Sequence, residues 1–401
     1  MIGGTLAVVL VAAGSVGAIA VYQVSNDFAK NSVDINDGTE APVPEIGAYE
    51  GGFNVLVIGS DAYKTRTTEL NDVNILVHVS ADQTSAVAVS IPRDLVVPFP
   101  PCYNPETGKT SYAMAGRPIN EALFYGGLNC AVTVVEALTG LEINYAGMIG
   151  FDGVAAMATA VGGVDVCTLA EINDDHVKLY LKPGTHHLTG WQALSFLRSR
   201  HGVGDGSDLT RISSQQVFLS ALLRKLKSNE TLTNGGTLLS LAKAAAANMT
   251  LSKELTQPAT IIAMAKALNN IPMDRITFVQ YPGSTGGEGI YEGKVQPKTA
   301  LAEQIFSAIK ADKPIGLDEA GDDRGSRPDP NATPDPEPTS DATPSPDAKP
   351  DADEKPSDDP SEAAAPSAPP ASQAPLPEKV VISGVRGQTA ADQTCTVGFL
   401  G

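Results

Sequence analysis

Apolar, β-rich runs that alternate with helical patterns restrict the fold of this chain more than any other feature. Three such runs lie close together at Phe53–Gly59, Val73–Ser80 and Ser85–Ile91, and the first is continuously apolar, as expected for a buried strand. Two later strands are predicted at Val164–Leu169 and Ile276–Pro282. Helical patterns fill the intervening chain at Cys130–Thr139, Gly153–Ala160, Asp208–Lys227, Gly236–Asn248 and Gln257–Asn269. The alternation predicts an α/β fold with helices on both faces of a sheet.

The N-terminal run carries no charge from Ile2 to Val21. Twenty helical residues span roughly 30 Å, which is the thickness of a bilayer core. We therefore predict a transmembrane anchor over residues 1–24, followed by a polar spacer over residues 25–50. The alternative is a cleaved signal peptide, because Ala18-Ile19-Ala20 fits a small-x-small cleavage pattern. Both readings place the rest of the chain outside the cytoplasm.

The composition changes sharply near the C-terminus. Pro328–Pro377 consists mostly of Pro, Asp, Ala, Ser and Thr, which cannot bury enough apolar surface to fold. We predict a folded catalytic domain over residues 51–313, a disordered acidic Pro-rich linker over 314–378, and a short C-terminal segment over 379–401. Of the formal net charge of −18, the stretch Asp318–Glu362 supplies −11. The overall acidity argues against a nucleic-acid partner.

The four cysteines are Cys102, Cys130, Cys167 and Cys395, and none has the CxxC spacing of a zinc site. An even number of cysteines outside the cytoplasm favours two disulfides. We favour the pairs Cys102–Cys130 and Cys167–Cys395, and free buried thiols are the alternative.

Two aspartates flank the loop between the first two predicted strands. Asp61 directly follows the first strand, and Asp72 directly precedes the second. If these strands are antiparallel neighbours, both carboxylates lie at one end of the sheet, where ligands gather in open α/β folds. Paired carboxylates suit Mg²⁺, which takes one or two protein carboxylates plus substrate phosphate oxygens. The alternative is a pair of solvated loop residues.

The third run ends in the motif SIPRD, Ser90–Asp94. Pro92 cannot continue a central ladder, so the strand stops there and exposes Arg93. Arg93 then lies at the same edge as the two aspartates or at the opposite one. A surface pair of Arg93 with Asp94, which contributes little energy, is the alternative.

The segment Leu194–Gln216 holds two more arginines before a Gly-rich loop. Arg198 and Arg200 share a face only in an extended segment, so Phe196–Arg200 is predicted to be extended. The loop that follows allows close approach of the backbone to a ligand.

The same segment continues into a helix for which Asp208 is the predicted N-cap. Arg211 and Gln215 are i and i+4, so they share a face near the helix N-terminus, which favours anions. Arginine matches phosphate through its planar fork, so these residues predict a pyrophosphate-binding site. Ordinary ion pairs to Asp205 and Asp208 are the alternative.

Other catalytic patterns are absent from the sequence. It contains neither GxxxxGK[ST] nor GxSxG, which argues against a P-loop and a serine hydrolase of that type. His186 and His187 lack a metal-binding context.

In their order along the chain, several segments between Phe53 and Pro282 resemble the LytR-CpsA-Psr (LCP) family of cell-wall phosphotransferases, especially its actinobacterial members. The matching segments are VLVIGSD, NDVNILVH, SIPRD, GGVDVC, LSFLRSR and DLTRISSQQ. The resemblance implies an αβα sandwich around a mixed central sheet, with a polyprenyl lipid in a long apolar pocket and its pyrophosphate at the mouth.

The resemblance also implies roles for individual residues. Asp61 and Asp72 match the metal-binding acids of the family, for Mg²⁺ with Mn²⁺ as an alternative, and Asp208 matches a supporting acid. The family's pyrophosphate-binding residues match Arg93, Arg198, Arg200, Arg211 and Gln215. One position departs: many members carry Arg-Ser-Asp-Thr where this chain has Leu70-Asn71-Asp72-Val73, so one expected arginine is missing. Arg66 in the same loop is a possible substitute.

The function implied is transfer of a glycopolymer phosphate, such as arabinogalactan, from a polyprenyl-pyrophosphate carrier to a wall acceptor such as peptidoglycan. Arg93, Arg198 and Arg200 would neutralise charge on the leaving lipid phosphate, and Asp94 is a candidate base. The enzyme would be a single-pass membrane protein with an extracytoplasmic catalytic domain. A non-catalytic protein that binds the carrier lipid for regulation, and a pyrophosphatase that uses water as acceptor, are the alternatives.

Overall fold

The computed structural model describes residues 24–35, 51–61, 69–105, 107–228, 235–332 and 376–399. The predicted anchor over residues 1–24 therefore lies almost entirely outside the described residues. So do Arg66 and the greater part of the predicted linker.

An eight-stranded mixed sheet forms the centre of the folded unit, in the order β1-β14-β9-β2-β3-β4-β15-β21. In that order its strands are Ser32–Val33, Met249–Ser252, Tyr145–Ile149, Phe53–Ser60, Asn71–Val79, Ala86–Ile91, Ile276–Gln280 and Gly387–Thr389. The pairs β1·β14, β2·β9 and β4·β15 are parallel, and the other neighbours are antiparallel. The predicted mixed central sheet is confirmed.

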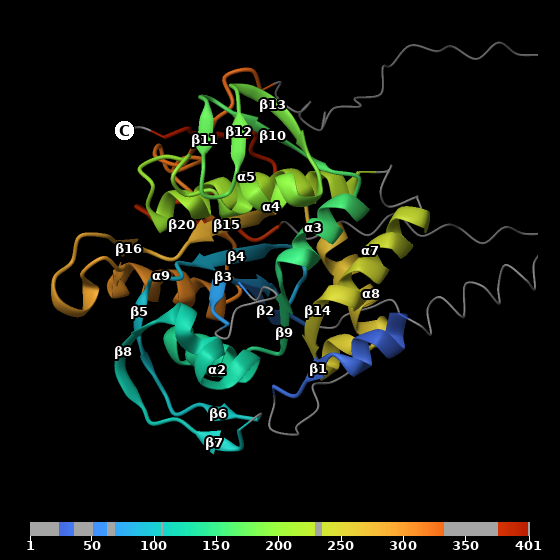
Figure 1. Cartoon of the computed structure of the whole chain (residues 1–401), viewed down its shortest axis with the longest axis vertical. Coiled ribbons are helices and arrows are strands. Elements are labelled where there is room, and N and C mark those ends of the chain that lie inside the picture. The colour runs from blue at the N-terminus through green and yellow to red at the C-terminus, as the bar shows by residue number, and fades with distance from the viewer. Residues whose placement is uncertain are drawn as a thin grey trace, which may run out of the picture. The chain divides into compact units, whose positions relative to one another are not determined.

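Helices cover both faces of this sheet (Figure 1). Because side chains alternate along a strand, Leu56 and Ile58 of β2 face one apolar cluster, while Val55 and Val57 face another. The first cluster includes residues of α2 (Ala122–Thr139) and α9 (Thr299–Lys310). The second includes residues of α5 (Asp208–Lys227), α7 (Gly235–Asn248) and α8 (Pro258–Asn270). The predicted helices on both faces are therefore present.

A second layer packs on the outer side of α5 (Figure 1). It contains α3 (Phe151–Ala160), α4 (Gly190–Arg198) and a small sheet in the order β13-β10-β22-β19. The strands of that sheet are Gly184–Leu188, Val164–Thr168, Thr394–Thr396 and Ser326–Pro328. An apolar cluster that includes Val166, Phe196 and Phe218 joins this layer to α5.

Short strand pairs complete the unit. They are β5 (Val96–Phe99) with β8 (Met114–Pro118), β6 (Tyr103–Asn104) with β7 (Lys109–Thr110), β11 (Ile172–Asp174) with β12 (Leu179–Leu181), β16 (Gly283–Ser284) with β17 (Gln296–Pro297), and β18 (Ile315–Gly316) with β20 (Val380–Val381). Single turns of 3-10 helix occur at η1 (Ile119–Glu121), η2 (Lys253–Thr256), η3 (Met273–Arg275) and η4 (Gly289–Tyr291).

The predicted start of the linker at residue 314 is wrong. The compact unit extends to Asp329, and the chain from Pro377 onward also belongs to it. The buried carboxylate of Asp322 accepts hydrogen bonds from the Ser213 hydroxyl of α5 and from the backbone N–H groups of Gly325 and Ser326. The composition of this acidic, Pro-bearing stretch could not reveal that its first residues are folded. They are held by one buried carboxylate that organises a turn, and a single residue does not change the average composition.

Part of the predicted spacer also belongs to the folded unit. Residues 24–30 are helical, and β1 adds a strand to the edge of the central sheet. Val24 and Phe28 are i and i+4 on this helix, and both join the apolar cluster shared with α7 and α8. The spacer prediction failed here because two apolar side chains on one helical face provide enough buried surface to dock a short, otherwise polar segment.

Within the described residues, one helical stretch, Ile119–Thr139, is long and apolar enough to cross a membrane. More than half of its apolar window is buried inside the protein, and its side chains fill the cluster on one face of the sheet. This stretch is therefore a core helix. Gly140 ends it in the left-handed conformation at φ 64°, as its place in the sequence predicted.

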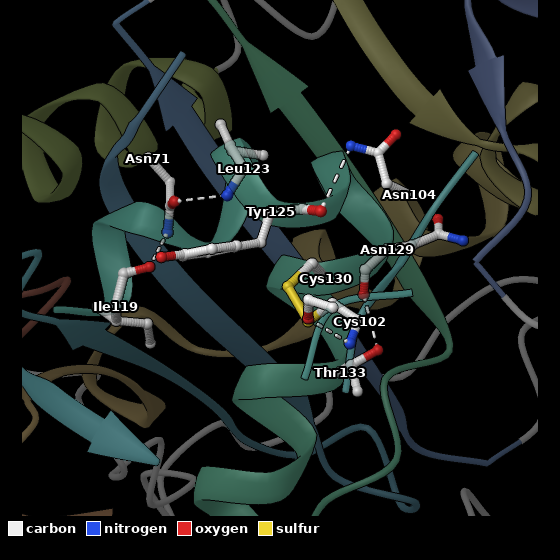
Figure 2. The surroundings of a disulfide bond; sticks show 10 residues. Asn71, Cys102, Asn104, Ile119, Leu123, Tyr125, Asn129, Cys130 and Thr133 are labelled. Atoms are coloured by element: carbon white, nitrogen blue, oxygen red, sulfur yellow. Dashed lines mark hydrogen bonds between the residues drawn. A yellow bond between two sulfur atoms is a disulfide. The ribbon is translucent and has the colours of Figure 1, made fainter. Parts of the chain in front are cut away.

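Both favoured disulfides form. Cys102–Cys130 fastens the chain between β5 and β6 to α2 (Figure 2). Cys167–Cys395 joins β10 to β22, which are parallel neighbours in the small sheet. The C-terminal segment also supplies β21, whose Gly387 lies so close to β15 that a Cβ there would stand 2.0 Å from the Phe278 carbonyl oxygen. The C-terminal segment is an integral part of the fold.

Candidate active site

Asp61 and Asp72 lie at one end of the central sheet. The strands β2 and β3 that carry them are antiparallel neighbours, with Ser60 opposite Asn71, as the sequence analysis required. The backbone N–H of Asp61 donates to the Leu70 carbonyl at 3.0 Å, and the N–H of Leu70 donates to Asp61 Oδ1 at 2.8 Å. These bonds close the two ends of the loop and hold the Asp61 carboxylate in a buried position.

Arg93 connects the sheet to the helix layer. It follows the end of β4, and its guanidinium donates to Asp72 Oδ1 at 2.7 Å. Its Nε lies 3.7 Å from Asp94 Oδ2 and 3.9 Å from Asp208 Oδ1. Burial lowers the pKa of Arg93, but the carboxylates of Asp72, Asp208 and Asp94 outweigh this effect and raise the pKa above its ordinary value. Arg93 thus lies at the same edge as the aspartates and carries a permanent charge.

The first turn of α5 supplies two predicted residues, Asp208 and Arg211. Ser207 is the N-cap and accepts a hydrogen bond from the Thr210 N–H, so Asp208 is the first helical residue and not the cap. The Asp208 carboxylate accepts from the backbone N–H of Arg93 at 3.0 Å and pairs with Arg211. Arg211 also donates to the Asp72 carbonyl at 3.0 Å.

Gln215 lies on the same buried face of α5 as Arg211. Its side-chain amide donates to the Leu197 carbonyl at 2.9 Å, so it ties the last turn of α4 to α5. The i, i+4 relationship therefore places both residues as predicted. Part of the donor capacity of Gln215 is used to hold α4.

The prediction that Phe196–Arg200 is extended is wrong. Helix α4 continues to Arg198, and the chain becomes extended only at Ser199, where ψ is 127°. The apolar residues Ala193, Leu194 and Phe196 bury one face of the helix, and that packing overrides the argument from arginine spacing. As a result Arg198 and Arg200 do not share a face. Arg198 lines one cavity and Arg200 lines another.

The first cavity is apolar, with a volume of about 160 Å³. Its walls come from β2, β3, α3, α4 and α5, and its polar lining residues are Ser60, Asp72, Arg198, Arg211 and Gln215. The Arg198 guanidinium carbon lies 4.1 Å from the centre of the Phe151 ring, which also lines the cavity. An apolar slot with a few charged groups suits an amphiphile with a hydrocarbon chain and an anionic head.

The second cavity is polar, with a volume of about 360 Å³. Its lining includes Arg200 and Asp94, together with Asp205, Ser207, Asp208, Thr285 and Lys294. Arg93 lies between the two cavities, because it contacts Asp72 of the first and both Asp94 and Asp208 of the second.

Two buried guanidinium nitrogens at this junction lack a hydrogen-bond partner within the described part of the chain. They are Arg93 Nε and Arg211 Nε. Buried polar groups are nearly always hydrogen-bonded, so each exception calls for an explanation. Two unsatisfied guanidinium donors beside an apolar cavity fit an anionic ligand.

The two sheet-end aspartates fit a hard cation. Asp72 lines the apolar cavity, whereas Asp61 is buried at the end of the neighbouring strand. Two carboxylates do not complete the coordination of Mg²⁺, and phosphate oxygens of a ligand would complete it. Elsewhere among the described residues, the cluster Cys167, Asp329 and Cys395 has ligand-like spacing, but its sulfur atoms form a disulfide and do not bind metal.

One positioning residue escaped the sequence analysis. Asp174 ends β11 and is buried, and its Oδ2 accepts hydrogen bonds from the Ser199 hydroxyl at 2.9 Å and from the backbone N–H groups of Arg200 and His201 at 3.0 Å. Burial raises the pKa of Asp174, but these bonds outweigh it and lower the pKa below its ordinary value. No sequence signal links Asp174 to a segment some 25 residues away.

Leu70, which stands where many family members carry arginine, lies in a segment that is tied to its neighbours by hydrogen bonds. The backbone of Leu70 binds Asp61, and the side chain of Asn71 bridges to the start of α2 (Figure 2). Asn71 donates to the Ile119 carbonyl at 3.0 Å and accepts from the Leu123 N–H at 3.2 Å. Residues 70 and 71 therefore fix the sheet end on which Asp72 is mounted.

Comparison with known proteins fits this arrangement. The LytR_cpsA_psr family model matches residues 18–310. The chain belongs to the LytR_cpsA_psr family. A relative within the family is the cell wall biosynthesis protein LcpA of Corynebacterium glutamicum, 27% identical over 71% of this chain and 60% of LcpA. The match thus spans less than two thirds of the length of LcpA.

Another relative is the polyisoprenyl-teichoic acid–peptidoglycan teichoic acid transferase TagT of Bacillus subtilis. It is 30% identical over 57% of this chain and 70% of TagT. The match to the crystal structure of B. subtilis TagV covers 66% of this chain and 98% of TagV, with 23% identity and a TM-score of 0.53, which shows a shared fold.

Proposed function

We propose that this protein is a phosphotransferase that moves a glycopolymer phosphate from a polyprenyl-pyrophosphate carrier to a cell-wall acceptor such as peptidoglycan. The relative TagT, a polyisoprenyl-teichoic acid–peptidoglycan teichoic acid transferase, supports the class of reaction. The observation that carries the proposal is the apolar cavity whose lining includes Asp72, Arg198 and Arg211, with Arg93 beside it. A hydrocarbon tail fits the apolar walls, and a pyrophosphate fits the arginines.

In this proposal the arginines bind and orient the pyrophosphate. Among the described residues, the buried Nε of Arg93 and that of Arg211 have no hydrogen-bond partner, so both can donate to phosphate oxygens without breaking existing bonds. Arg198 and Arg200 approach from the two cavities and neutralise charge on the leaving lipid phosphate. Asp208 keeps Arg93 and Arg211 in place through its contacts with both.

Mg²⁺, or Mn²⁺ in its place, would be held by Asp61 and Asp72 and would supply further charge neutralisation on the phosphates. Asp94 would accept the proton of the acceptor hydroxyl as that oxygen attacks the sugar-bearing phosphorus. The phosphoanhydride bond to the lipid phosphate breaks, and polyprenyl phosphate leaves. Catalysis would depend mostly on positioning and charge stabilisation.

We also propose that the protein is anchored in the cell membrane with its catalytic domain outside. The uncharged run from Ile2 to Val21 supports the anchor, and two disulfides support an oxidising compartment. For the glycan we propose an arabinogalactan-like polymer, on the strength of the actinobacterial sequence motifs. Linkage analysis of wall glycan from a depletion strain separates this polymer from teichoic acid.

Arg93→Ala tests the function in the purified full-length protein with a lipid-linked donor and a peptidoglycan acceptor. Loss of a preorganised charged donor should lower kcat by about 10²-fold to 10³-fold. Arg327→Ala is the matched control, because Arg327 is half exposed and, in the described part of the chain, its guanidinium pairs with groups of the neighbouring Asp323. Full transfer by Arg93→Ala contradicts the role of Arg93. Release of lipid phosphate without acceptor-linked product identifies a pyrophosphatase, and binding without release identifies a regulatory lipid-binding protein.

A further inference from the structure

Among the described residues, the polar cavity beside Arg93 shares no lining residue with the apolar cavity. It is built from two distant parts of the sequence: the segment from Arg200 to Asp208, and the chain around the β16–β17 pair, which contributes Thr285 and Lys294. Asp94 lies where these two parts meet. Arg93 therefore borders this cavity through its contacts with Asp94 and Asp208, and it also contacts Asp72 of the apolar cavity.

Lys294 is held beside Asp94 by the backbone. The Val295 N–H donates to the Asp94 carbonyl at 2.9 Å, and the Val96 N–H donates to the Val295 carbonyl at 3.0 Å. This two-bond ladder fixes Lys294 in register with Asp94, and Lys294 Nζ lies 3.5 Å from Asp94 Oδ1. The backbone of Lys294 is thus held beside Asp94 by these hydrogen bonds, so that its flexible side chain starts from a fixed point.

The contacts of Asp94 leave room for another partner. Its three cationic neighbours, Lys294, Arg93 and Arg200, lie 3.5, 3.7 and 3.9 Å from its oxygens. These distances exceed the 2.7–2.9 Å of a well-formed charge-assisted hydrogen bond. The carboxylate is therefore held in place by charge while it can still accept a short hydrogen bond from a hydroxyl group.

The lining of the polar cavity favours a hydroxyl-rich, uncharged ligand. Besides its backbone groups it presents two cations, three carboxylates, and the hydroxyls of Ser207 and Thr285. The opposite charges nearly balance, so neither a second polyanion nor a hydrocarbon chain is favoured. Sugar hydroxyls donate and accept hydrogen bonds, and this mixed lining can satisfy both.

We propose that the polar cavity is the subsite for the acceptor glycan, and that Lys294 is a positioning residue that orients the acceptor hydroxyl toward Asp94. This inference rests on the proposed transfer function. The hydroxyl oxygen forms the new bond to phosphorus on the Arg93 side of the cavity, its proton passes to Asp94, and the lipid phosphate leaves on the side of the apolar slot. Acceptor and leaving group thus occupy opposite sides of Arg93.

Lys294→Ala tests the subsite in the full-length protein, with transfer measured over a range of acceptor concentrations. The acceptor is a soluble, uncrosslinked peptidoglycan glycan chain, and donor-site occupancy is measured separately as equilibrium binding of decaprenyl phosphate. We expect the KM for acceptor to rise about tenfold, because a contact worth one charged hydrogen bond is lost. Binding of decaprenyl phosphate should stay within twofold of the wild type, and Lys294→Arg should recover most of the acceptor affinity.

Lys298→Ala is the matched control, because Lys298 is an exposed lysine on the same segment and does not line the cavity. Thr285→Val, a substitution of similar shape at another lining residue of the cavity, should also raise the KM for acceptor. An unchanged acceptor KM in Lys294→Ala overturns the subsite and leaves the transfer function intact. Equal weakening of decaprenyl phosphate binding assigns Lys294 to the donor site and also overturns it. A wild-type protein that transfers to no glycan refutes the proposed function itself.

Discussion

Asp174 offers the sharpest test of how the fold positions an arginine of the site. Its Oδ2 accepts from the Ser199 hydroxyl and from the backbone N–H groups of Arg200, His201 and Gly202, and its Oδ1 accepts from the His176 N–H. Asp174→Ala leaves four backbone donors without an acceptor. At about 1 kcal/mol for each, the free energy of unfolding should fall by about 4 kcal/mol.

Asp174→Asn separates positioning from gross loss of structure. The amide oxygen can take the place of Oδ2, but the amide N–H₂ then faces the His176 N–H, and all the bonds lose the charge of the acceptor. We expect roughly half the loss of the alanine variant, about 2 kcal/mol. Transfer should fall about 10-fold to 100-fold, because small displacements of a charged group are costly in catalysis.

The assay is urea unfolding followed by circular dichroism, together with the transfer reaction. The control is Asp175→Asn, because Asp175 is the next residue in sequence and its side chain is 78% exposed. If Asp174→Asn unfolds at the same urea concentration as Asp175→Asn and transfers at the wild-type rate, the reasoning is refuted.

The same carboxylate predicts a dependence of stability on pH. Its pKa is lowered in the folded protein, so its contribution to stability is present above the unfolded pKa of about 3.9. That contribution is lost as the pH falls through the folded pKa. Urea midpoints measured from pH 6 down to below the unfolded pKa should therefore move closer together for the wild type and Asp174→Asn at the acid end. A constant difference over this range contradicts the assignment.

Three further predictions concern the donor site and the C-terminal segment. Removal of divalent ions with EDTA should abolish transfer, Mg²⁺ or Mn²⁺ should restore it, and Asp72→Asn should raise the Mg²⁺ concentration required; full activity in EDTA contradicts the metal site. Phe151→Leu should weaken decaprenyl phosphate binding about threefold to fivefold, since a cation–π contact with Arg198 contributes about 1 kcal/mol, and unchanged binding denies that contact a role. The double variant Cys167→Ser/Cys395→Ser should lose about 2–5 kcal/mol of stability, measured by urea unfolding against oxidised wild type, and an unchanged midpoint denies the bond a stabilising role.

The sheet end of the site could be predicted from the sequence. Asp61 follows a continuous apolar run, and Asp72 directly precedes the next run. Such runs mark where strands begin and end, and they can be recognised from neighbouring residues alone. The i, i+4 spacing of Arg211 and Gln215 likewise needs only helical geometry. The antiparallel pairing of β2 with β3, on which the argument about Asp61 and Asp72 depended, is present. Both favoured disulfides are present as well.

The separation of Arg198 from Arg200 could not be predicted from spacing. Helix α4 continues through Arg198 because its apolar face is buried against α5. That burial depends on tertiary packing, which the spacing of the two arginines does not reveal. Lys294 and Asp174 were missed for a related reason. Each meets its partner through contacts between segments far apart in the chain, and neither belongs to a local motif.

The C-terminal strands have a consequence for how the protein is made. During N-to-C synthesis, β15 and β10 lack their partners β21 and β22 until residues 387–396 have emerged. The Pro- and Asp-rich stretch that precedes those strands is thus an insertion within a folded unit and not a terminal extension. A protease cut within residues 330–376 would produce two polypeptides that migrate as one until the Cys167–Cys395 bond is reduced. A protein cut in this stretch therefore remains one molecule for as long as that disulfide is intact.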